Sequence, residues 1–113
     1  MKKFLLLFLF LIPLIGFSQS ITFTEQDREF KIYTNTGQVE FSYFSGDNIS
    51  RNYNGDVNKV GPVYISYNYD DKPSKIGSVY ISYNYDGQVK KIGGLYIYYD
   101  YEGRITRTSG SVK

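Results

Sequence analysis

The sequence of 113 residues contains no cysteine, no histidine and no tryptophan. Without cysteine, disulfide bonds cannot staple the fold, and both a thiol nucleophile and a lipid anchor on an N-terminal cysteine are excluded. Without histidine, the commonest general base and the commonest metal ligand are missing. The usual catalytic triads and most transition-metal sites are therefore excluded.

Alanine is also absent, and Leu95 is the only leucine after residue 18. Isoleucine, valine, tyrosine, phenylalanine and threonine dominate that part of the chain, and these residues suit a pleated, half-buried surface. No window after residue 18 shows the spacing of an amphipathic helix. The composition predicts an all-β fold.

Residues 1–18 have the pattern of a cleaved signal peptide. Two lysines precede an apolar run over 4–15, and Gly16-Phe17-Ser18 places small residues where a signal peptidase reads the chain. The run is shorter than the roughly 20 apolar residues that span a bilayer. We therefore expect an exported mature chain that begins at Gln19, is periplasmic or extracellular, and has no stable membrane anchor.

Cleavage would also remove the net charge. Two of the 13 lysines and arginines lie in the leader, and the other 11 balance the 11 aspartates and glutamates. A nucleic-acid or anionic-membrane surface requires an excess of positive charge on one face, and the composition offers none. We expect no nucleic-acid partner, and the low net charge removes one defence against self-association.

A repeat of 16 residues fills most of the mature chain. Lys59-Val60-Gly61 recurs at 75–77 and 91–93, residues 64–70 recur at 80–86 and 96–102, and a weaker copy lies at 48–55. A unit this short buries no core alone, so neighbouring units must pack on one another. The expected organisation is an N-terminal strand and hairpin at 19–42, four hairpin repeats at 43–106 and a frayed tail at 107–113.

Each unit has the pattern of an antiparallel hairpin. Over 79–85, apolar side chains at odd positions alternate with Tyr80, Ser82 and Asn84, so one face is apolar. Asp86-Gly87 favours a type I′ turn, whereas Asp70-Asp71 predicts a differently shaped turn in the second unit. The hairpins form either a meander sheet or a β-solenoid, and the repeat alone does not choose between them.

Stacked units would align tyrosines 16 residues apart into ladders. We expect two ladders on the apolar face to form the core: Tyr67, Tyr83 and Tyr99, and Tyr53, Tyr69, Tyr85 and Tyr101. Tyrosines on the opposite face, beside serine and asparagine, are better candidates for ligand contact. The predicted ligand-binding residues are Tyr64, Tyr80, Tyr96, Tyr98, Asn68 and Asn84.

Carboxylates are the main acid–base groups left, in pairs such as Asp70-Asp71 and Asp100 with Glu102. These acids lie at predicted turns, where aspartate is expected for backbone reasons, and the spacing of Asp70, Asp71 and Asp86 follows no known calcium loop. The lysines and arginines of the repeats are interpreted as their charge partners or as edge-strand protection. We expect no enzyme, no cofactor and no metal site.

The last unit resembles the YD repeat of RHS-type shell proteins, because Tyr99-Asp100 is followed by Gly103-Arg104-Ile105. The other copies depart from that pattern, and the period is shorter than is usual there. The rhythm of tyrosine and glycine is also similar to choline-binding and toxin cell-wall-binding hairpin repeats, although the tryptophan of those modules is missing. The whole chain resembles small exported tyrosine-rich repeat proteins of Bacteroidota. These resemblances imply a repeat fold and export, and they transfer no chemistry.

Two functions compete on this basis. The first is an exported, non-catalytic module that binds a polysaccharide or a protein partner through exposed tyrosines. The alternative is a self-associating structural or matrix protein, since segments such as 79–85 have high β-propensity without proline or charge, and a linear repeat leaves two open sheet edges.

Overall fold

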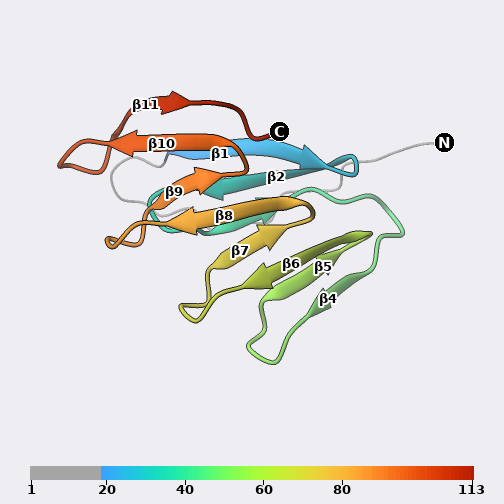
Figure 1. Ribbon diagram of the computed structural model, residues 1–113. Coiled ribbons are helices and arrows are strands. Elements are labelled where there is room, and N and C mark those ends of the chain that lie inside the picture. The colour runs from blue at the N-terminus through green and yellow to red at the C-terminus, as the bar shows by residue number, and fades with distance from the viewer. Residues whose placement is uncertain (1–18) are drawn as a thin grey trace.

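The computed structural model describes residues 19–113, so the predicted signal peptide at 1–18 lies outside the described residues. The described part is all-β, as predicted, and consists of 11 strands (Figure 1). None of these residues forms a helix able to cross a membrane.

The first three strands pair antiparallel in chain order: β1 (Ser20–Glu25), β2 (Arg28–Tyr33) and β3 (Val39–Phe41). The other eight form one antiparallel meander, also in chain order. They are β4 (Ile49–Arg51), β5 (Val57–Val60), β6 (Val63–Tyr67), β7 (Pro73–Ile76), β8 (Val79–Tyr83), β9 (Val89–Ile92), β10 (Leu95–Tyr99) and β11 (Ile105–Ser109). Of the two expected arrangements, a meander sheet or a β-solenoid, the fold is the meander.

Two kinds of turn alternate along the meander. The turns β5–β6, β7–β8 and β9–β10 have two residues and begin with glycine at positive φ: 59° at Gly61, 62° at Gly77 and 60° at Gly93. Glycine at the first central position is what a type II′ turn requires, and Pro62 suits the second because its φ is negative. These turns all lie at the same end of the strands, on the right in Figure 1.

Longer turns join the strands at their other ends, at 52–56, 68–72, 84–88 and 100–104. We name this row of turns the acidic turn edge, which is distinct from the edge strands of the sheet. The predicted type I′ turn at Asp86-Gly87 is wrong, because only Gly87 has positive φ and its N–H bonds to Asn84 O at 3.0 Å. The predicted difference in the second unit is also wrong. Asp71 takes φ 63° in the place of glycine and donates to Asn68 O over the same 3.0 Å.

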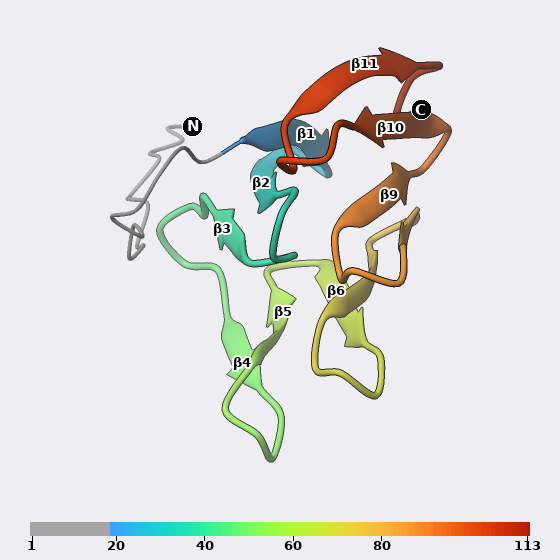
Figure 2. The ribbon, with the colours of Figure 1, turned by 90° about the vertical axis from the view of Figure 1, so that its left-hand side faces the viewer.

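Each long turn is followed by a bulge. The pairing register shifts between Ser66 and Tyr67 and between Ser82 and Tyr83, and it shifts likewise in β4 and β10. Bulges bend a strand and increase its twist. Figure 2 shows the result, an eight-stranded sheet that curves around one side of the three-stranded sheet.

The core lies between the two sheets. Phe30 and Ile32 of β2 are fully buried, as are the inward residues of the repeats such as Ile76 and Ile92. The Val89 N–H donates to Thr34 O at 2.8 Å and joins the sheets through the backbone.

The C-terminal segment is more ordered than the tail expected at 107–113. Strand β11 continues to Ser109 and stays paired with β10 as far as that residue. Beyond it, the Gly94 N–H donates to Val112 O at 3.3 Å, and Lys113 forms an ion pair with Glu25. The segment is held because Gly93 and Gly94 carry no side chain: a Cβ on Gly93 would lie 2.1 Å from Val112 O.

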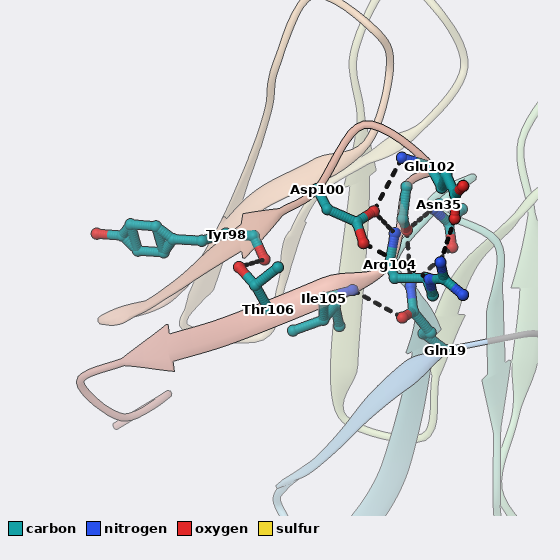
Figure 3. A network of polar contacts seen from close by, with 9 residues as sticks. Gln19, Asn35, Tyr98, Asp100, Glu102, Arg104, Ile105 and Thr106 are labelled. Carbon is teal, nitrogen blue, oxygen red and sulfur yellow. Dashed lines mark hydrogen bonds and ion pairs between the residues drawn. The ribbon is translucent and has the colours of Figure 1, made fainter.

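Gln19, the expected first residue of the mature chain, holds the last long turn (Figure 3). Its side-chain amide donates to Gly103 O at 3.0 Å and to Asn35 Oδ1 at 3.1 Å, and its Oε1 accepts the Ile105 N–H at 2.8 Å. The N-terminal sheet is thereby tied to the last repeat.

Candidate functional site

The type II′ turns determine how the outer face of the eight-stranded sheet is built. Residues on either side of such a turn are paired, so Lys59 lies opposite Tyr64, Lys75 opposite Tyr80 and Lys91 opposite Tyr96. The lysine Nζ lies 5.4, 4.9 and 4.9 Å from the centre of the respective ring. These are cation–π distances.

A fourth pair extends the row onto the last strand. Arg107 of β11 lies opposite Tyr98 of β10, with its guanidinium carbon 4.1 Å from the ring centre. We name these four rings and four cations the Tyr–Lys stripe: Tyr64, Tyr80, Tyr96, Tyr98, Lys59, Lys75, Lys91 and Arg107.

The rings of the stripe remain open to solvent. Tyr64 and Tyr80 are each 63% exposed, Tyr96 is 44% exposed and Tyr98 is 36% exposed. The later rings are more covered because β11 lies beside them on the same sheet. Such rings, held by a cation at one side and otherwise free, offer flat apolar platforms on a rigid support.

Charge is sharply segregated on this sheet. Strands β4 to β11 contain no acidic residue, and their six cations are Arg51, Lys59, Lys75, Lys90, Lys91 and Arg107. The acids of this region lie at the acidic turn edge instead: Asp56, Asp70, Asp71, Asp86, Asp100 and Glu102. Over residues 19–113 the 11 positive and 11 negative side chains balance, so composition alone gave no indication of a positive face.

The two predicted asparagines lie at the turn edge rather than on the stripe. Asn84 Oδ1 accepts the backbone N–H groups of Asp86 and Gln88 at 2.9 and 3.0 Å. Asn68 Oδ1 makes the equivalent bonds in its own turn, at the same distances. These oxygens are occupied by the backbone, which gives the asparagines a structural role as turn caps.

A shallow hollow of about 750 Å³ brings one of them near the stripe. Asn84 and Tyr98 both line it, together with Lys90 and Asp100. Of the six predicted binding residues, the hollow joins these two.

The tyrosines of the long turns are not core residues, which overturns one expected ladder. Tyr53, Tyr69, Tyr85 and Tyr101 are between 94 and 105% exposed. Each follows the turn-capping residue, outside the strand, so the alternation over 79–85 does not continue to its last position.

The other expected core ladder is correct. Tyr67, Tyr83 and Tyr99 pack against the core, and their hydroxyls donate to Val57 O, Pro73 O and Val89 O at 2.6, 2.6 and 2.5 Å. Each hydroxyl therefore bonds to the preceding strand, directly beside the bulge of that strand. Burial raises the pKa of Tyr67 and of Tyr99 to about 12 and raises the pKa of Tyr83 as well.

A separate cavity of about 530 Å³ lies between the β2–β3 turn and the first two long turns. Asp56 and Asp71 line it, and a hydrogen bond shared with Asp71 raises the pKa of Asp56, with burial as a further cause. The described residues contain no group of three or more side chains suited to a metal ion.

Comparison with known proteins finds no matching family, no matching curated protein and no matching solved structure.

The cations of the stripe are the residues that sequence reasoning missed. Arg104 forms ion pairs with Asp100 and Glu102 at the acidic turn edge, as expected for a charge partner of the turn acids. Lys75, by contrast, lies over the ring of Tyr80. The pattern Lys-x-Gly-x-x-Tyr, repeated three times, carried the information, since a two-residue turn at the glycine places that lysine opposite that tyrosine.

Proposed function

We propose that the chain is an exported, non-catalytic module that binds an anionic polysaccharide across the Tyr–Lys stripe. The carrying observation is the row of exposed rings, each beside a cation, on strands that contain no acid. Sugar rings stack on flat aromatic faces, and the lysines supply the partners for carboxylate or sulfate groups.

The spacing of the rings favours one kind of polymer. Tyr64, Tyr80 and Tyr96 lie on β6, β8 and β10, so neighbouring rings are two strands, or about 10 Å, apart across the sheet. They are also offset by two residues, or about 7 Å, along the strands, because Lys75 pairs with Ser66 on one side and with Tyr80 on the other. The rings therefore form a diagonal row, and a linear polymer with an acidic sugar at every second position that runs along this diagonal meets a ring and its lysine about once per disaccharide.

The test is the affinity of the chain from Gln19 for hyaluronan, with polygalacturonate and neutral dextran for comparison, by isothermal titration calorimetry. We expect binding to the acidic polymers that weakens with added salt, because exposed charge pairs are screened. Dextran should bind weakly or not at all.

Two variants assign the binding to the stripe. Replacing Lys59, Lys75 and Lys91 with glutamine should abolish binding to the acidic polymers. Replacing Tyr69, Tyr85 and Tyr101 with alanine is the matched control, since it removes three exposed tyrosines from the turn edge and should leave binding intact. Absence of binding to every polymer, or equal loss in the control, would refute the proposal and turn the search to a protein partner.

A further inference from the structure

The two open edges of the eight-stranded meander belong to opposite phases of the repeat. Strand β4 is the counterpart of β6, β8 and β10, because Ile49 pairs with Val60 as Ile65 pairs with Ile76 and Ile81 with Ile92. Strand β11 is the counterpart of β9, because Ile97 pairs with Thr108. In the described chain, β4 and β11 are the ends of the sheet and lie far apart (Figure 1).

Each edge therefore lacks the neighbour that the other edge provides. Within the chain, β9 has a strand of the β10 type on its far side, and β11 has none. A strand of the β10 type begins the sheet as β4. We propose that β11 of one copy pairs with β4 of a second copy, so that the chain assembles head to tail.

The register follows from the repeat. Strand β9 meets β10 through Lys91 opposite Tyr96 and Ile92 opposite Leu95. The same phase places Arg107 of one copy opposite Asn48 of the next. The inward row of aliphatic side chains continues from Ile105 to Ile49, both of which are half-buried against the core.

The backbone of β11 presents its hydrogen-bonding groups to that edge. The Gly93 N–H donates to Tyr80 O across β8 and β9, so the neighbouring Ile92 directs its own N–H toward β10, since direction alternates along an antiparallel strand. Thr108 occupies the same phase in β11 and directs its N–H away from β10. After Ser109 the chain folds back to Gly94 and leaves this edge open.

A pairing between two different edges is heterologous, so it adds copies in series, which stay open unless the rotation between copies closes a ring, and it does not give a two-fold dimer. Sedimentation velocity on the chain from Gln19 should show oligomers that lengthen with concentration. Thr108→Pro removes the outward N–H without removing a bond to β10, and it should weaken association by about tenfold, the value of one net hydrogen bond. Thr108→Val keeps the N–H and is the control that should associate like the wild type.

Mixing distinguishes this arrangement from other edge contacts. The Thr108→Pro chain keeps its β4 edge, so it should add to wild-type series with full affinity and then bind the next copy about tenfold more weakly, which shortens the series. If β11 paired with β11, the variant would instead join wild-type chains with reduced affinity. If β4 paired with β4, the variant would associate as the wild type does. Either result, or a wild-type chain that stays monomeric at millimolar concentration with both edges intact, would overturn the proposal.

Discussion

The two faces of the eight-stranded sheet use the same residue in opposite ways. On the inner face, Tyr83 packs against the core and its hydroxyl holds Pro73 O at 2.6 Å. On the outer face, Tyr80, three residues earlier, is 63% exposed and contacts Lys75 of the preceding strand, β7. The inner tyrosines join the repeats to one another, and the outer tyrosines leave their rings available to a ligand.

The largest expected effect compares these two tyrosines directly. Tyr83→Ala should lower the free energy of unfolding by about 3 kcal/mol, because it opens a cavity and frees a carbonyl. Tyr80→Ala should lower it by less than about 1 kcal/mol, the range of an exposed cation–π pair. Urea denaturation of both variants checks the difference, and equal losses would break the distinction between the faces.

Alkaline titration gives an independent check on the inner face. The raised pKa values, about 12 for Tyr67 and Tyr99, mean that folding holds these protons more tightly than the unfolded chain does. The stability they contribute is complete below pH 10 and is lost as the pH rises from 10 through 12. Unfolding midpoints should therefore fall over this window, and the variant Tyr67→Phe, which lacks one of these hydroxyls, should show a smaller fall.

The next effect concerns the contact that seats the three-stranded sheet on the inner side. Burial alone would raise the pKa of Glu25, but hydrogen bonds from Lys113 and Ser78 and the charge of Lys113 outweigh it, so the pKa is lowered. Glu25→Gln should cost about 1.5–3 kcal/mol, the range for a hydrogen bond to a charged group. Wild-type stability from this group is present above its unfolded pKa and lost as the pH falls through the folded one. The variant should lose that acid sensitivity.

The strand pattern was predictable because it depends on local spacing. The strands over 20–41 and the repeat hairpins follow from alternation and from glycine at the turns. The geometry of the turns was less predictable. A type I′ turn, with both central residues at positive φ, is consistent with Gln26 and Asp27, at 50° and 69°, rather than with Asp86-Gly87. A bulge following each long turn changes which turn fits there, and the bulge has no sequence mark of its own.

The candidate site was half predictable for a related reason. The four exposed tyrosines of the stripe were identified from alternation alone. The lysines were interpreted as charge partners of the turn acids or as edge-strand protection, because composition does not show that the sheet separates cations on strands from acids at turns. Which tyrosines end outside the strands likewise depends on where each strand stops, and alternation cannot show that.

A fourth prediction sharpens the comparison at the acidic turn edge, where one repeat departs from the rest. Asp71 stands where the other units have glycine, at positive φ and against Asp56. Asp71→Gly should raise stability at pH 7 by about 1 kcal/mol, through relief of backbone strain and of carboxylate repulsion. Because folding raises the pKa of Asp56, this carboxyl contributes to stability at low pH, and that contribution is lost as the pH rises through its pKa in the folded chain. The gain should thus shrink toward pH 4, as thermal melts at both pH values would show.

The smallest expected effect on stability has the largest consequence for binding. Lys75→Gln removes the cation beside Tyr80 but keeps most of the aliphatic stem, so the fold should lose only about 0.5 kcal/mol. Affinity for an acidic polymer should fall clearly, because one of three evenly spaced lysines is gone. The same change at Lys90, which is exposed and lies over none of the rings of the stripe, should alter binding less. If the two variants bound equally, charge alone would explain affinity, and the alignment of lysine with tyrosine on the outer face would carry no specificity.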